Sequence, residues 1–214
     1  MIRTEHREDK WMFPFVSYSP TEKSGALPLI IQLHGAGERG DGKESLSLVD
    51  FHGFSKVIAD KEFPCLFVMP QCPADSFWAA KVESIIAFIR QLTEAFDVDP
   101  KKIYLTGLSM GGFGTWYTAM ARPDLFAAIA PVCGGGMAWN APVLSMPIWA
   151  FHGACDTVVS PSQSDEMVAV LKSVGADVKY SRIEGVGHDV WNCAYNEKLS
   201  EWMLNHPQGE VKQA

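Results

Sequence analysis

The sequence predicts a single α/β domain in which helices cover both faces of a mostly parallel sheet. Short apolar runs alternate with amphipathic helical patterns along most of the 214-residue chain, and this alternation is typical of parallel sheets. Hydrophobic residues make up 47% of the chain and charged residues 20%, as in ordinary globular proteins. No internal repeat or low-complexity linker divides the sequence, so we expect one domain over residues 1–214.

The apolar runs and the helical patterns between them place the expected elements along the chain. Strands are expected over residues 27–33, 64–69, 102–106, 126–132, 147–151 and 177–183. Helices are expected over residues 81–96, 110–121, 162–174 and 195–204. Gly107 is expected to end the third of these strands, and an aromatic, partly alternating stretch at residues 11–18 suggests an antiparallel edge strand.

Net charge and cysteine usage narrow the expected partners and compartment. The formal net charge of −7 argues against nucleic acid and anionic membrane surfaces as partners. Residues 1–10 are charged and contain no apolar core, so they resemble neither a secretory signal nor a membrane span. The five cysteines form no C-x-x-C pair, and Cys65 and Cys133 lie in strand-like apolar runs. We therefore expect a reducing, cytoplasmic setting.

A nucleophile elbow is predicted at residues 107–111, which read Gly-Leu-Ser-Met-Gly. The pentapeptide follows an apolar run and precedes a helical pattern, which is the strand–turn–helix context that such an elbow needs. The sharp turn strains the backbone of Ser109 and exposes its hydroxyl group, and a side chain at either flanking glycine would clash with the neighbouring strand or helix. A chance match in a glycine-rich turn is the alternative, but the context and a further glycine, Gly112, favour a nucleophile.

A serine hydroxyl needs a general base, usually a histidine that a carboxylate orients. After a nucleophile elbow, the acid precedes this histidine along the chain. Three histidines follow Ser109. His206 is expected in solvent at the end of the last helix, and His152 is expected to be a structural residue at a strand end. His188 lies in a loop between the last strand and the last helix, so we predict that His188 is the base.

The predicted acid is Asp156, because it lies in a loop at the carboxyl end of the strand at residues 147–151 and a helix follows it. Glu184, at the end of the last strand, is the second candidate. The other carboxylates considered between the serine and the histidine lie in a turn, in the first turn of a helix or at the start of a strand. These are Asp124, Asp165, Glu166 and Asp177.

The glycine-rich loop after the strand at residues 27–33 is the expected partner of the elbow in an oxyanion hole. We expect the backbone N–H groups of Met110 and Ala36 to be the donors, with Gly37 as the alternative to Ala36. The side chains of His34 and Glu38 are expected to shape this loop. No combination of Asp, Glu, His and Cys has metal-ligand spacing, so no metal site is predicted.

Together these motifs resemble those of the α/β-hydrolase superfamily. Within it they are most similar to the compact carboxylesterase, dienelactone-hydrolase-like and "predicted peptidase" group that borders the feruloyl esterases. The resemblance implies the α/β-hydrolase fold and acyl hydrolysis of a small-molecule ester by Ser109, Asp156 and His188, with no cofactor. The matching segments are residues 33–40, 69–73, 104–112, 152–156 and 187–191.

The short connection between the strands expected at residues 126–132 and 147–151 leaves no room for a cap domain, so an open site is expected. Three tryptophans, Trp78, Trp139 and Trp191, are expected on loops at the catalytic edge of the sheet. They would either line a groove for a sugar or a phenolic acyl group or pack beneath the site.

The sequence as a whole therefore favours a serine carboxylesterase that works through an acyl-enzyme on Ser109. Three alternatives stay open: a serine peptidase of the same fold, a feruloyl or acetylxylan-type carbohydrate esterase, and a binding module on a hydrolase scaffold that has lost its activity. No feature of the sequence indicates the physiological substrate or the oligomeric state.

Overall fold

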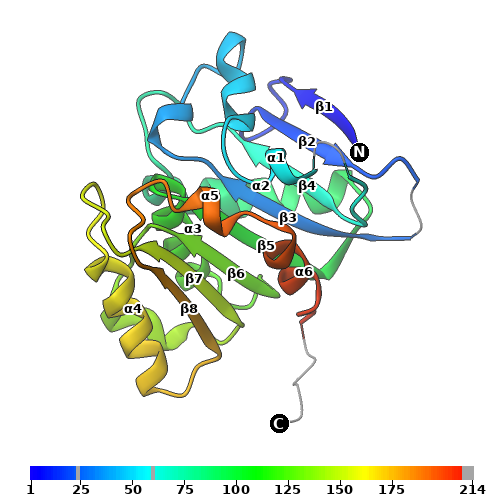
Figure 1. Ribbon diagram of the computed structural model, residues 1–214. Coiled ribbons are helices and arrows are strands. Elements are labelled where there is room, and N and C mark those ends of the chain that lie inside the picture. The colour runs from blue at the N-terminus through cyan, green and yellow to red at the C-terminus, as the bar shows by residue number, and fades with distance from the viewer. Residues whose placement is uncertain (23–24, 59–60, 209–214) are drawn as a thin grey trace.

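The computed structural model describes residues 1–22, 25–58 and 61–208, and these residues contain one eight-stranded sheet (Figure 1). The strand order is β1-β2-β4-β3-β5-β6-β7-β8. β1 pairs antiparallel with β2, and β2 pairs antiparallel with β4, whereas all pairs from β4 to β8 are parallel. The strands are β1 (Ile2–His6), β2 (Phe15–Ser19), β3 (Leu27–Leu33), β4 (Leu66–Pro70), β5 (Val98–Leu108), β6 (Ala128–Val132), β7 (Ile148–Gly153) and β8 (Val178–Ile183).

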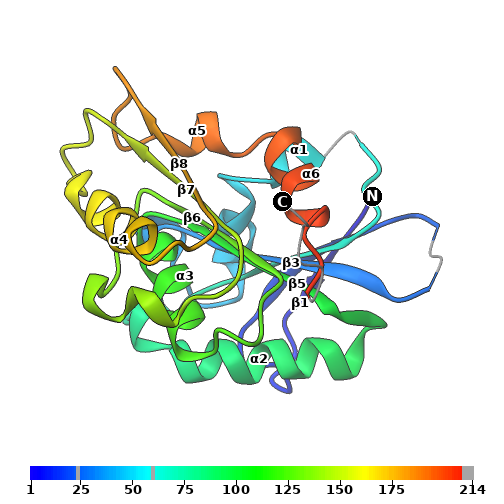
Figure 2. The same ribbon diagram turned by 90° about the horizontal axis from the view of Figure 1, so that it is seen from below.

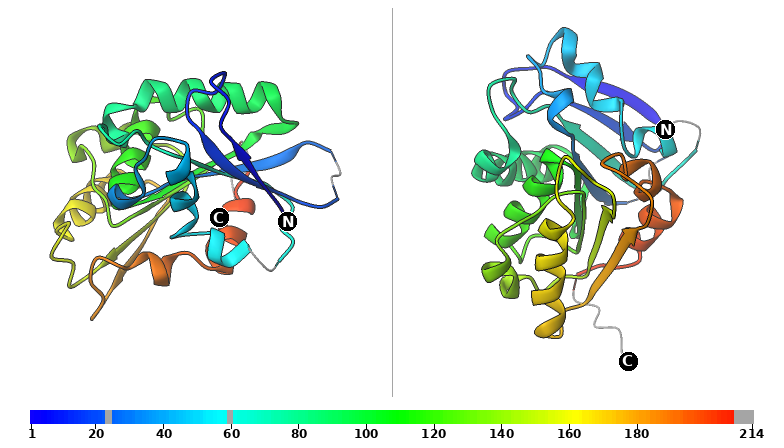
Figure 3. Two further views of the ribbon diagram at one scale, coloured as in Figure 1. Left: turned by 90° about the horizontal axis from the view of Figure 1, so that it is seen from above. Right: turned by 60° about the vertical axis from the view of Figure 1, so that its left-hand side comes forward.

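Helices cover both faces of the sheet. The α-helices are α1 (Ser55–Ile58), α2 (Val82–Ala95), α3 (Met110–Ala121), α4 (Ser162–Ser173), α5 (Trp191–Ala194) and α6 (Glu197–Leu204). The 3-10 helices are η1 (Ala36–Glu38), η2 (Glu44–Asp50), η3 (Trp78–Ala80) and η4 (Ala138–Val143). α2, α3 and α4 lie on one face, and α1, α5 and α6 lie on the other (Figures 2 and 3). No helix in the described ranges is both long and apolar enough to cross a bilayer.

The central strands are apolar throughout because each of their faces packs against a layer of helices. In β3, Leu29 and Ile31 belong to the hydrophobic cluster on the side of α2, where they join Ile85. Ile30, between them, belongs to the cluster on the opposite side, where it joins Phe54. Successive side chains of a strand point to opposite faces, so one continuous apolar run supplies both cores.

The predicted α/β class, with a mostly parallel sheet between two layers of helices, is confirmed. Between β6 and β7, the chain forms only the short helix η4, and the described residues include no cap domain. Two expectations about strands are wrong. β5 continues through Gly107, which pairs with Leu33 of β3 rather than ending the strand. β2 is not the edge strand, because β1 lies outside it.

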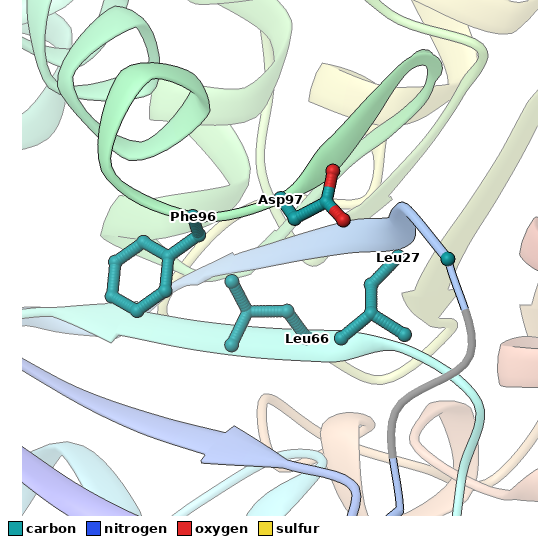
Figure 4. Close-up of a pocket in the computed structure, with 5 residues that line it drawn as sticks. Leu27, Leu66, Phe96 and Asp97 are labelled. Atoms are coloured by element: carbon teal, nitrogen blue, oxygen red, sulfur yellow. The ribbon is translucent and has the colours of Figure 1, made fainter.

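A pocket of about 230 Å³ opens at the amino-terminal edge of the sheet (Figure 4). Leu27 and Leu66, the first residues of β3 and β4, line it together with Phe96, Asp97 and Gly25. Ligands of parallel sheets bind at the opposite edge, outside the carboxyl ends of the strands. The candidate site described next lies at that carboxyl edge.

Candidate active site

Ser109 lies in the turn between β5 and α3, with backbone angles of φ 53° and ψ −115°. This conformation is strained for a residue with a side chain and is typical of functional sites. A Cβ atom at Gly107 would lie 2.3 Å from the carbonyl oxygen of Gly111, and one at Gly111 would lie 2.0 Å from that of Leu33. Only glycine fits at either position, so the predicted elbow geometry is confirmed.

Ser109, His188 and Asp156 form a continuous hydrogen-bonded row. His188 Nε2 lies 2.9 Å from Ser109 Oγ, and His188 Nδ1 lies 2.7 Å from Asp156 Oδ2. Ser109 follows β5, Asp156 follows β7 and His188 follows β8. The carboxyl ends of these three strands meet at one edge of the sheet. Since a carboxylate only accepts hydrogen bonds, Nδ1 carries the proton and Nε2 is left to accept one from the serine hydroxyl. Glu184, the second candidate for the acid, is exposed and pairs with Arg182 instead.

The side chain of Asp156 is buried and firmly held. Its Oδ1 atom accepts backbone hydrogen bonds from Val158 and Val159, each at 2.9 Å. Burial by itself would raise the pKa of Asp156, but the hydrogen bonds from His188, Val159 and Val158 outweigh burial and hold this pKa below its ordinary value. The carboxylate therefore stays ionised and can orient His188.

His152 approaches the same carboxylate oxygen as His188. Its ring is fully buried, with Nδ1 2.7 Å from Ser164 Oγ and Nε2 3.0 Å from the carbonyl oxygen of Val159. Nε2 also lies 3.3 Å from Asp156 Oδ2. The structural role predicted for His152 is confirmed. His206, expected in solvent, is instead half-buried and packs against the ring of Trp202.

The loop after β3 passes directly beside the elbow. A Cβ atom at Gly111 would lie 2.8 Å from the carbonyl oxygen of His34, so this loop and the start of α3 touch through their backbones. Ala36 is exposed at the start of η1, and Met110 is half-buried at the start of α3. In the described part of the chain, neither of their N–H groups has a hydrogen-bond partner. This arrangement agrees with the predicted oxyanion hole, whose role stays a prediction, as does that of Gly37.

The side chain of His34 helps to hold the loop after β3 in place, as predicted. Its Nε2 atom accepts the N–H of Cys72 at 2.9 Å, and its Nδ1 atom lies 2.6 Å from the carbonyl oxygen of Gly35. Burial lowers the pKa of His34 to about 4 against the opposing effect of the Gly35 bond, so its ring is neutral near pH 7. Trp78 donates from Nε1 to the carbonyl oxygen of His34 at 3.0 Å and is fully buried. Of the two alternatives expected for Trp78, the structure shows packing beneath the site and not the lining of a substrate groove.

Arg39 also holds the turn of η1, through two hydrogen bonds to backbone carbonyl groups. Its Nε atom donates to the carbonyl oxygen of Ala36 at 2.9 Å, and its Nη1 atom donates to that of Ser76 at 3.2 Å. The first bond spans the turn of η1, and the second ties it to the loop before η3. Sequence analysis assigned Arg39 no role, because a single arginine in a glycine-rich loop has no pattern that reveals its partner.

The other two tryptophans differ in their surroundings. Trp139, on η4, is 78% exposed. Trp191 is half-buried at the start of α5, and its ring lies perpendicular to that of His188, with centroids 5.3 Å apart. A contact of either residue with substrate stays a prediction.

Three side chains in the described ranges could together approach a metal ion: Cys133, Asp156 and His188 offer ligand atoms within 4.8 Å of one another. Two of them already share the hydrogen bond of the row described above. Burial raises the pKa of the Cys133 thiol to about 12, so this thiol stays protonated near pH 7 and is a poor ligand. The hydrogen-bonded row therefore explains this cluster better than a metal site does.

This combination of sheet, elbow and hydrogen-bonded side chains is that of the α/β hydrolases. Residues 63–200 match the family described as Phospholipase/Carboxylesterase. The match covers more than half of the chain, and the chain belongs to this family. The sequence-based resemblance to esterases of the α/β-hydrolase superfamily is thereby confirmed.

Among similar proteins, two are described as esterases and one as a depolymerase. A thermostable esterase of known crystal structure is 30% identical, with a TM-score of 0.81, over 97% of this chain and 63% of that one. A bifunctional acetylxylan esterase/xylanase of Neocallimastix patriciarum is 24% identical over 89% of this chain and 33% of its own length. A poly(3-hydroxyoctanoate) depolymerase of Pseudomonas fluorescens is 26% identical over 78% and 64%, respectively. This chain thus spans less than two thirds of each of these three relatives.

Proposed function

We propose that this chain is a serine carboxylesterase. Ser109 Oγ attacks the ester carbonyl while His188 Nε2 takes the hydroxyl proton, and Asp156 keeps His188 in the required tautomer. The backbone N–H groups of Met110 and Ala36 bind the oxyanion. His188 then returns its proton to the leaving alkoxide, which departs as an alcohol. Water, deprotonated by His188, releases the acid from the acyl-enzyme and restores Ser109.

The observation that carries this proposal is the 2.9 Å separation between His188 Nε2 and Ser109 Oγ, together with the 2.7 Å bond from Nδ1 to Asp156. A serine becomes a nucleophile when a correctly protonated base lies within hydrogen-bond reach. Cys133, the thiol nearest to this row, supports the same assignment, because its raised pKa leaves it protonated and unable to compete as a nucleophile.

The test is Ser109→Ala assayed on p-nitrophenyl acetate. We expect kcat to fall by about a millionfold, to the level left by binding and the oxyanion hole alone. A fluorophosphonate probe should label the unsubstituted protein and leave the variant unlabelled. Full activity in Ser109→Ala would reject the proposal, and an unsubstituted protein that neither hydrolyses the ester nor reacts with the probe would point to a binding module instead.

A second candidate is an esterase for acylated carbohydrates. Two relatives favour it: the acetylxylan esterase/xylanase, and a feruloyl esterase B of Piromyces equi that is 38% identical over 34% of this chain. Trp139, largely exposed beyond β6, offers an aromatic surface that a sugar or phenolic ring would stack on. A panel of acetyl, butyryl, octanoyl and feruloyl esters separates the two candidates. An amide of the preferred acyl group tests the peptidase alternative, and faster cleavage of this amide would favour a peptidase.

A further inference from the structure

Glu38 presents an unexplained carboxylate beside the oxyanion loop. It ends η1, two residues after Ala36, and only 9% of its side chain is exposed. Its Oε2 atom has no hydrogen-bond partner in the described part of the protein. A buried charge without a partner is costly, so such a group calls for a specific role. Two histidines approach it: His34 Nδ1 lies 3.8 Å from Oε2, and His52 Nε2 lies 3.5 Å from Oε1.

His34 does not serve as the partner of Glu38. Its Nε2 atom accepts the N–H of Cys72, so its one proton is on Nδ1 and is directed to the carbonyl oxygen of Gly35 at 2.6 Å. The lowered pKa of His34 keeps the ring in this neutral form. The ring that remains for Glu38 is that of His52.

His52 connects Glu38 to the region of the catalytic base. It follows η2, is about a quarter exposed and packs against the ring of Trp191 with centroids 5.1 Å apart. Trp191 in turn lies perpendicular to the His188 ring at 5.3 Å. Burial lowers the pKa of His52, the charge of Glu38 opposes this change, and Lys56 adds to it. The Nε2 atom of His52 remains the histidine nitrogen closest to the Glu38 carboxylate, at 3.5 Å from Oε1.

The same three residues hold an unusual share of unpaired polar atoms. In the described ranges, six buried side-chain polar atoms lack a partner, and three of them are Glu38 Oε2, His52 Nδ1 and Trp191 Nε1. Glu38, His52 and Trp191 come from three separate segments of the chain, yet each contacts the next, and Trp191 contacts the ring of His188. Structures retain such costly groups where function requires them more often than elsewhere.

We propose that Glu38, His52 and Trp191 form a positioning chain for the catalytic base. In this chain Glu38 holds the ring of His52, His52 supports Trp191, and Trp191 limits the rotation of His188. Asp156 holds the His188 ring through a hydrogen bond, and Trp191, the last residue of the positioning chain, supports the same ring through an aromatic contact. The inference rests on the proposed function, since it gives His188 the role of base.

The chemistry of the reaction gives such a support a purpose. His188 gains and loses a proton twice per turnover, and each time its Nε2 atom has to face the reacting oxygen. Small displacements of a catalytic group cost large factors in rate. The perpendicular contact of the Trp191 ring with His188, with centroids 5.3 Å apart, would restrict such displacements. The proposal replaces the predicted substrate contact of Trp191 with a role in turnover.

The test is a double-mutant cycle on p-nitrophenyl acetate hydrolysis. Trp191→Leu should lower kcat about tenfold through the lost ring contact, and Trp191→Phe should restore much of this loss. Glu38→Gln should lower kcat about threefold. In both variants KM should stay within about twofold, because the proposed role of both residues is to position His188 and not to bind substrate. In the Trp191→Leu background, Glu38→Gln should cause no further loss, because the link between Glu38 and His188 is already broken.

Glu44→Gln is the matched control, since it removes an exposed carboxylate from the neighbouring helix η2 and should leave kcat unchanged. Should Glu38→Gln fail to fold, His52→Gln breaks the same chain at a more exposed position. Equal losses from Glu38→Gln in both backgrounds, or a raised KM with unchanged kcat in Trp191→Leu, would overturn the inference. Ser109→Ala serves as the parallel assay: activity in that variant rejects the proposed function, whereas its inactivity with an additive cycle rejects only the positioning chain.

Discussion

His152 and His188 both lie beside the carboxylate of Asp156, yet their surroundings differ. Both have a ring nitrogen within 3.3 Å of Asp156 Oδ2. His152 is sealed from solvent, and its two nitrogens contact Ser164 and Val159. His188 is 18% exposed, and its outer nitrogen faces the Ser109 hydroxyl. A histidine beside a carboxylate is therefore not necessarily a general base. It also needs access to substrate and a ring nitrogen that is free to accept a proton.

The largest effect is expected from replacing His188, the partly exposed histidine. His188→Gln should lower kcat/KM for p-nitrophenyl acetate about 10⁵-fold, because Ser109 loses its base. The melting temperature should change little, since the ring is partly exposed and leaves no large cavity. Steady-state kinetics and circular dichroism measure the two effects. Substantial residual activity in this variant would mean that another group, such as His152, deprotonates the serine.

The shared carboxylate gives the next largest effect. Asp156→Asn keeps the shape of the side chain but removes the charge that holds the Nδ1 proton of His188, so kcat should fall about 10⁴-fold. Asp189→Asn, at the exposed neighbour of His188, is the matched control and should leave kcat unchanged. Equal effects of the two substitutions would show that general charge near the histidine matters, rather than the hydrogen bond.

Replacing the buried histidine should have the opposite profile. His152→Ala removes the hydrogen bonds to Ser164 and Val159 and leaves a cavity. The free energy of unfolding should fall by about 3 kcal/mol, while kcat falls far less than in His188→Gln. Urea unfolding monitored by tryptophan fluorescence measures the loss. An inactive but fully stable His152→Ala would reverse the roles assigned to the two histidines.

A smaller effect is expected in the pH dependence of stability, through the buried histidine His34. The folded pKa of His34 is about 4, against an ordinary value of 6.5. Between these values the unfolded chain binds more protons than the folded one, so the free energy of unfolding falls as the pH is lowered through this window. The slope from His34 is at most about 1.4 kcal/mol per pH unit. His34→Gln should show a shallower fall than the unsubstituted protein in urea unfolding at pH 6.5, 5.5 and 4.5, and equal slopes would contradict this account.

Local patterns predicted most of the parallel sheet and missed its outermost strand. β3 and β4 were predicted almost to the residue because strands buried on both faces consist of continuous apolar runs. β1 has no such pattern, since it is an outer strand whose Ile2 and Arg3 are exposed. Its position depends on pairing with β2 and on an ion pair between Arg3 and Asp50. Partners that distant along the chain leave no local signal.

The sequence alone was enough to propose the nucleophile and the order of its partners. Gly107, Ser109 and Gly111 stand close enough in the chain to specify a turn, and strand–helix alternation brings the loops of Asp156 and His188 to one edge of the sheet. Tertiary structure decided what surrounds them. It buried Trp78, sealed His152 from solvent while leaving His188 partly exposed beside the same carboxylate, and linked Glu38 to His188 through contacts with His52 and Trp191. Exposure and contact between distant segments arise only when the whole chain packs, and no short pattern records them.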